Sequence, residues 1–289
     1  MLKMTSYDLL CNTGRALIKG QVYSDDKKQE IVKTLLSGMD TPETVDRFLG
    51  RVKAQVDGRM MYPLFYTPPY NGGKKYRLIT GQMPKTHLLS ANHYELEILR
   101  LLTLWGSDQD QVAQMIDQSL KRLDATCFGH FCSEGECIGA GVSTLRLLSA
   151  LRPVNNVWIE EILKPLGDIF SGIKGQAATN HNLPVFYFCL ALSGIKSDMA
   201  AQIIRDRKDF LLTLLKRGWL TGPAENDKYT PLTKYVIRNT LACLPECEYL
   251  QNAEIYISDK DGRVYCDDLS AALLESDRLH PHVFLPDQE

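Results

Sequence analysis

The stretch ELEILRLLTLW, residues 95–105, indicates how this chain folds. Its apolar side chains recur at every third position and therefore share one face of an α-helix. The residues on that face are Leu96, Leu99, Leu102 and Trp105. Gly106 follows directly and ends the helix. A second amphipathic pattern then runs from Asp110 to Leu123, so we predict two consecutive helices that pack together as a pair.

The same arrangement returns along the chain. The tetrapeptide LRLL of residues 99–102 occurs again at 145–148, which is 46 residues later. A period of ~40–50 residues that contains two helices is typical of helical repeat arrays. The further helices that we predict span 138–151 and 157–170, then 184–192 and 197–217, and finally 230–244. The sequence thus predicts an all-α protein whose helix pairs form an α/α toroid or a partial toroid.

The segments that flank the repeats follow other patterns. Before them, three short amphipathic helices are expected at about 5–19, 25–38 and 42–56, and a Pro- and Gly-rich stretch follows with a short strand at 75–79. We predict four parts: an N-terminal helical segment (1–60), an aromatic-bearing connection (61–90), the helical-pair repeats (91–250), and a C-terminal hairpin with its tail (251–289).

The C-terminal part carries a signal for β-structure. Residues 254–257 and 263–266 contain alternating apolar positions, and Asp261-Gly262 lies between them. An Asp-Gly pair between two alternating runs favours a tight turn. We therefore expect a small β-hairpin there, followed by a short helix and a surface arm.

The composition restricts the class of protein. Hydrophobic residues make up 44% of the chain and charged residues 24%, which is typical of a folded globular protein. The formal charge of −2 provides no net positive field that would attract nucleic acid. The apolar stretches are too short to cross a bilayer, and eight cysteines in 289 residues are too few for a disulfide framework. These features predict a cytoplasmic protein without a membrane span or a nucleic-acid partner.

Two stretches within residues 91–244 resemble a known family. The stretch Cys137–Pro153 is similar to the inner helix of the squalene-cyclase and prenyltransferase repeat proteins, with its cysteine-rich lead-in, and Lys234–Leu244 is similar to a closing helix. The resemblance implies an α/α toroid with a central cavity for a hydrophobic or isoprenoid-like small molecule. The chain lacks the Asp-x-Asp-Asp signature with which triterpene cyclases protonate their substrate, so we do not expect acid-initiated cyclisation.

The loop between the first two helix pairs contains a candidate metal site. Cys127, His130, Cys132 and Cys137 fall within eleven residues. Thiolates and imidazoles are the ligands that zinc prefers, and zinc is the candidate ion for this loop. The spacing of the cysteines differs from standard zinc patterns, however. The alternative is a structural loop with partly buried thiols and an exposed imidazole.

Two helix starts contain candidate catalytic residues. His93 and Glu95 lie at the start of the first inner helix, where they could act as base and acid toward a ligand in the cavity. His181 has the equivalent place in the third pair. The alternative is that these residues merely cap helices and bind neighbouring groups.

Three functional hypotheses remain open from the sequence. The first is a toroid-like protein that binds, and acts on, a hydrophobic or isoprenoid-like molecule. The second is a non-catalytic helical-repeat module that binds a protein partner along its inner face. The third is a metal-dependent lyase or hydrolase built around the loop from Cys127 to Cys137.

Overall fold

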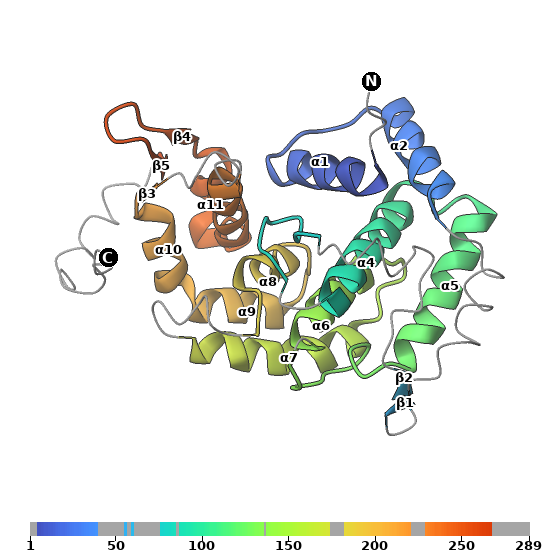
Figure 1. Cartoon of the computed structure of the whole chain (residues 1–289). Helices are drawn as coiled ribbons and strands as arrows, with labels where there is room; N and C mark the ends of the chain where they lie inside the picture. The colour runs from blue at the N-terminus through green and yellow to red at the C-terminus, as the bar shows by residue number, and fades with distance from the viewer. Residues whose placement is uncertain are drawn as a thin grey trace.

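The computed structural model is mostly helical, as predicted (Figure 1). It describes residues 5–39, 55–56, 59–60, 76–84, 87–135, 137–173, 182–220 and 229–267. The helices are α1 (Ser6–Ile18), α2 (Asp25–Ser37), α4 (His87–Trp105), α5 (Asp110–Asp124), α6 (Cys137–Leu148), α7 (Asn156–Gly172), α8 (Val185–Leu192), α9 (Asp198–Asp206), α10 (Lys208–Lys216), α11 (Tyr229–Leu241) and the 3₁₀ helix η2 (Pro245–Asn252). Within these residues, none of the helices is both long and apolar enough to cross a bilayer.

The helix pairs predicted from the sequence are present, and their first helices pack side by side. Helix α4 packs along α6, α6 packs against α8, and α8 packs against α11. The second helices flank this row, with α5 on α4, α7 on α6 and α9 on α8. The leucines of both LRLL tetrapeptides are buried between these helices. The apolar periodicity therefore identified the faces that form the core.

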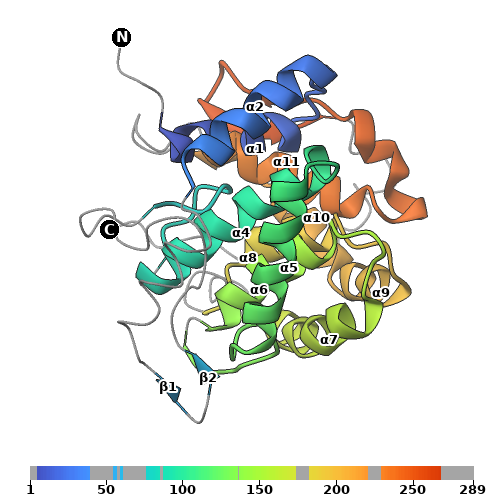
Figure 2. The same cartoon turned by 90° about the vertical axis from the view of Figure 1, so that its right-hand side faces the viewer.

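The two N-terminal helices belong to the same hydrophobic core. Helix α1 contacts both α11 and α4, which are the last and the first of the row, and α2 packs on α1 and α4. Figure 2 shows α1 and α2 above α4 and beside α11. The predicted helices at 5–19 and 25–38 are confirmed. The predicted helix at 42–56 lies mostly outside the described residues, and its last two residues form the strand β1 (Gln55–Val56) instead.

The segment of residues 76–84 lies between α1, α4 and α8 (Figure 1). Leu78 and Ile79 are buried, and these described residues belong to no strand, so the strand expected at 75–79 is wrong. The segment is tied by bonds from the Tyr7 hydroxyl to the Arg77 carbonyl (2.9 Å), from the Ile79 N–H to His93 Nε2 (2.8 Å) and from the Tyr187 N–H to Gln82 Oε1 (3.3 Å).

The single helix predicted at 197–217 is wrong, because the chain breaks at Arg207 into α9 and α10. The Arg207 guanidinium donates to the carbonyls of Ile173 at 2.6 Å and Ser171 at 3.3 Å. It also lies over the Phe210 ring at 4.3 Å. The last carbonyls of a helix lack helical partners, so Arg207 satisfies the end of α7 and is fixed there.

The predicted C-terminal hairpin is confirmed. Strands β4 (Ile255–Ile257) and β5 (Arg263–Cys266) pair antiparallel, with Tyr256 opposite Tyr265. Gly262 in the turn has a positive φ of 66°, a conformation that favours glycine. The short strand β3 (Trp219–Leu220) adds to β5 and makes a three-stranded sheet that the sequence did not indicate. A second pair joins β1 to β2 (Arg59–Met60).

A buried lysine connects α11 to the end of α10. The Lys234 ammonium donates to the carbonyl of Leu214 at 2.8 Å, to that of Leu215 at 2.6 Å and to that of Arg217. These carbonyls belong to the last turn of α10 and to its C-cap residue Arg217, where backbone acceptors have no helical partner. One side chain from α11 thus satisfies the C-terminus of the helix before it.

The substitution Lys234→Met tests this connection. Methionine keeps the length of the apolar stem but leaves buried carbonyls without a donor, so we expect the free energy of unfolding to fall by ~1–3 kcal/mol. Urea denaturation followed by circular dichroism measures it. The control is Lys260→Met in the exposed hairpin turn, which should change stability by less than about 0.5 kcal/mol. Equal effects of the two substitutions would contradict the assigned role.

Candidate functional site

Three cysteine side chains come together at the start of α6. The sulfur atoms of Cys127, Cys132 and Cys137 all lie within 4.8 Å of one another, and all three residues are partly exposed. The Sγ atoms of Cys127 and Cys137 are 3.5 Å apart. Cys137 is the first residue of α6, where the positive end of the helix dipole favours a thiolate. The structure therefore collects three of the four predicted metal ligands.

The loop that carries these thiols is fixed to its neighbouring helices. The Thr144 hydroxyl on α6 donates to the Phe128 carbonyl at 3.2 Å, and the Trp158 indole on α7 donates to the Gly129 carbonyl at 2.6 Å. The Thr126 Oγ1 accepts a hydrogen bond from the Gly129 N–H at 3.0 Å and so stabilises the turn. Phe128 is buried in the core. The thiols thus belong to a loop whose backbone is held on both sides.

His130, the fourth predicted ligand, is engaged elsewhere. Its Nδ1 lies 3.0 Å from a carboxylate oxygen of Glu161, and its Nε2 lies 3.1 Å from the Asp124 carbonyl. The imidazole also stacks on the Trp158 ring, with centroids 5.8 Å apart. Both ring nitrogens therefore have partners, and His130 lies outside the group of sulfurs.

Burial raises the pKa of the thiols at both ends of the cluster. Loss of solvent is the largest cause for Cys127 and for Cys137. Each thiol also lies beside another sulfur, and a second thiolate nearby would be repelled. The two groups are therefore protonated at neutral pH when no cation is present. A metal ion would have to displace these protons.

The predicted catalytic pair lies inside the protein. His93 and Glu95 are both buried, and His93 Nε2 accepts the Ile79 N–H at 2.8 Å. Burial lowers the pKa of His93 to about 4, so the imidazole is neutral at pH 7. This contact fixes the segment 76–84 on α4, which is the structural alternative considered for this histidine. His181 lies outside the described residues.

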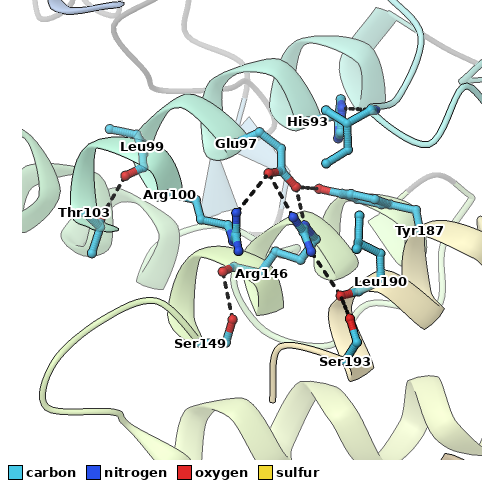
Figure 3. A network of polar contacts seen from close by, with 11 residues as sticks. His93, Glu97, Leu99, Arg100, Thr103, Arg146, Ser149, Tyr187, Leu190 and Ser193 are labelled. Carbon is cyan, nitrogen blue, oxygen red and sulfur yellow. Dashed lines mark hydrogen bonds and ion pairs between the residues drawn. The ribbon is translucent and has the colours of Figure 1, made fainter. Parts of the chain in front are cut away.

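A buried ionic network next to His93 was not found from the sequence (Figure 3). Arg146 on α6 makes a two-pronged pair with Glu97 on α4, through Nε to Oε1 and through NH2 to Oε2 at 3.2 Å. The Tyr187 hydroxyl on α8 donates to Glu97 Oε1 at 2.7 Å. Arg146 also donates to the Leu190 carbonyl at 3.0 Å. The network therefore joins three successive first helices.

Two guanidinium groups share the one carboxylate of Glu97 in this network. Burial alone would raise the pKa of Glu97, but the positive charges of Arg146 and Arg100 lower it to about 2. Glu97 is thus ionised at any physiological pH. Arg100 and Arg146 each occupy the second position of an LRLL tetrapeptide, and that coincidence is the one signal in the sequence that could have indicated the network.

Comparison with known proteins finds no matching family model, no similar curated protein and no similar solved structure.

The buried state of His93 predicts a specific pH dependence of stability. In the unfolded chain the imidazole binds a proton near its ordinary pKa of 6.5, whereas in the folded chain it does so only near pH 4. The unfolded state therefore binds more protons between these values, and the wild type should lose about 3 kcal/mol as the pH falls from 6.5 to 4. Urea denaturation at several pH values in this range measures the loss.

The matched variant is His93→Gln, because the glutamine oxygen can still accept the Ile79 N–H and does not titrate. We expect a clearly smaller decrease of its unfolding free energy over the same pH range. Parallel pH profiles for the two proteins would show that His93 is not a buried neutral imidazole.

The shape of the cysteine loop requires glycine at position 129. A Cβ there would lie 1.7 Å from the Leu123 carbonyl oxygen, which is backbone and cannot move aside easily. We expect Gly129→Ala to open the turn and to lower the unfolding free energy by ~1–3 kcal/mol. Gly172→Ala is the control, because a Cβ at Gly172 meets nothing within 4 Å. A Gly129→Ala protein as stable as this control would refute the assigned geometry of the loop.

Proposed function

We propose that this protein binds a thiophilic metal ion, with zinc as the first candidate, through Cys127, Cys132 and Cys137. The observation that carries the proposal is the convergence of three sulfur atoms within 4.8 Å. Zn–S bonds of about 2.3 Å place two sulfurs of a tetrahedral site about 3.8 Å apart. Small side-chain rotations would bring the cluster to this spacing.

The surroundings of the cluster support the proposal. The loop backbone is held by Thr144 and Trp158, so the thiols are positioned before an ion arrives and little chain entropy is lost on binding. The N-terminus of α6 stabilises the negative charge of a Cys137 thiolate. A neutral imidazole is not needed, because three thiolates already form a soft donor set.

The number of ligands bears on the kind of site. Within the described residues, the cluster has three donors, and His130 is held away from it by Glu161 and Asp124. Structural zinc sites usually have four protein ligands, whereas catalytic sites have three and keep one position for water or substrate. This favours a metal-dependent lyase or hydrolase over a purely structural site. The reaction itself stays a prediction.

The toroid and its apolar ligand remain a second proposal. It is supported by the contacts of α1 with both α11 and α4, which would close the row of first helices into a ring. The buried residues Leu78 and Ile79 lie between α1, α4 and α8, so an isoprenoid-like molecule in that place would have to displace this segment. The protein-interaction hypothesis likewise stays a prediction.

Zinc titration tests the metal site. Metal-free protein, purified under reducing conditions and titrated against a chromophoric chelator, should take up one equivalent of zinc. Affinity should fall as the pH is lowered, because zinc must displace protons from thiols whose pKa burial has raised. Each of Cys127→Ser, Cys132→Ser and Cys137→Ser should weaken binding at least about tenfold.

The control for the titration is Cys243→Ser, which removes an exposed cysteine outside the cluster and should leave zinc affinity unchanged. Two outcomes would reject the proposal: wild-type protein that takes up no zinc, or cluster variants that bind as tightly as Cys243→Ser.

A further inference from the structure

Cys127 and Cys137 form a contact pair of thiols. Their Sγ atoms are 3.5 Å apart, and the third thiol, Cys132, lies within 4.8 Å of both. The chain has eight free cysteines, and among the described residues these three form a group of neighbouring sulfurs. Cys11, Cys189, Cys247 and Cys266 are buried, and Cys243 Sγ contacts backbone carbonyls. The cluster is therefore the place where two thiols are close enough to join in a disulfide.

We propose that Cys127 and Cys137 are a redox modification site, at which a peroxide produces a reversible disulfide that prevents zinc binding. The part that concerns zinc rests on the proposed metal site. The part that concerns the disulfide rests on the sulfur contact alone. Two of the three zinc ligands are consumed when the disulfide forms, so the metal-bound and the oxidised states exclude each other.

The chemistry is balanced with hydrogen peroxide as the oxidant. The small fraction of one cysteine that has lost its proton attacks a peroxide oxygen, the O–O bond breaks, and a sulfenic acid forms while the other oxygen takes up the proton lost by the thiol and leaves as water. The neighbouring sulfur then attacks the sulfenic sulfur, the S–O bond breaks, and a second water leaves. Two thiols lose two electrons in total, and one peroxide is reduced to two waters.

The position of the pair predicts that the fold survives oxidation. Cys127 follows α5 and Cys137 begins α6, so the disulfide closes a loop that Thr144 and Trp158 already hold in shape. The sulfurs need to approach from 3.5 Å to a bonded distance of about 2.0 Å. Cys132 stays beside the new disulfide as a free thiol, from which thiol–disulfide exchange can begin.

The experiment uses the full chain in metal-free and zinc-loaded forms. Each is treated with a small excess of hydrogen peroxide, free thiols are counted, and the disulfide is located by mass spectrometry of non-reduced peptides. We expect the metal-free protein to lose two thiols and to show a Cys127–Cys137 bridge that dithiothreitol reverses. The zinc-loaded protein should release its zinc to a chromophoric chelator as the same bridge forms, with an unchanged circular dichroism spectrum.

Two variants sharpen the result. Cys132→Ser keeps the contact pair and should still form the bridge, whereas Cys137→Ser should not. The inference is overturned if metal-free wild-type protein keeps all its thiols, or if the bridge maps to other cysteines. The metal-free arm decides the disulfide even if no zinc binds, so failure of the metal site and failure of the redox site are told apart.

Discussion

The pair of Glu97 and Arg146 is the contact on which the arrangement of the helices depends. Both side chains are almost fully buried, and removing such charges from water costs several kcal/mol for each ion. This cost is offset because the two groups form a two-pronged ion pair. In addition, Glu97 accepts a hydrogen bond from the Tyr187 hydroxyl, and Arg146 donates one to the Leu190 carbonyl. A shift of α4 or α6 by one turn would leave a charge unpaired inside the core, and a shift of α8 would remove the hydrogen bonds of Tyr187 and Leu190. The network thus selects one register for helices whose leucine-rich faces could otherwise slide.

The sequence contained most of the fold because apolar periodicity is a local property. It located the helix pairs and the hairpin, and it failed where a distant group decides the local structure. The break at Arg207 is an example, since the carbonyls of Ser171 and Ile173 that hold this arginine lie more than thirty residues away. Arg146 is a second example. A helical pattern places such a residue in solvent, and only the carboxylate of Glu97 on the neighbouring helix α4 explains its burial.

In the candidate sites, too, the sequence predicts what neighbouring residues determine and misses what distant residues determine. The three thiols could be predicted because eleven consecutive residues contain them, and a short loop keeps its side chains close. The direction of His130 could not be predicted, because Glu161 and Trp158 come from α7 and turn the imidazole away from the sulfurs. The sequence predicts His93 and Glu95 at the start of a helix, but α4 begins at His87 and both residues lie inside it. The segment 76–84 covers His93 and makes it a structural acceptor. Proximity of potential ligands or catalytic residues in the sequence therefore predicts a functional site less reliably than the tertiary contacts that orient their side chains.

Helix α6 connects the ionic network to the cysteine loop. Arg146 fixes this helix from within the core, Cys137 begins it, and Thr144 between them holds the loop through the Phe128 carbonyl. The thiol cluster is consequently attached to a scaffold whose stability comes from buried leucines and the pair of Glu97 and Arg146 rather than from a metal ion. In small zinc domains the ion supplies the folding energy, so that losing it unfolds the chain. Here the core is large enough to fold without it, so the proposed metal binding and oxidation of the thiols would leave the helices in place.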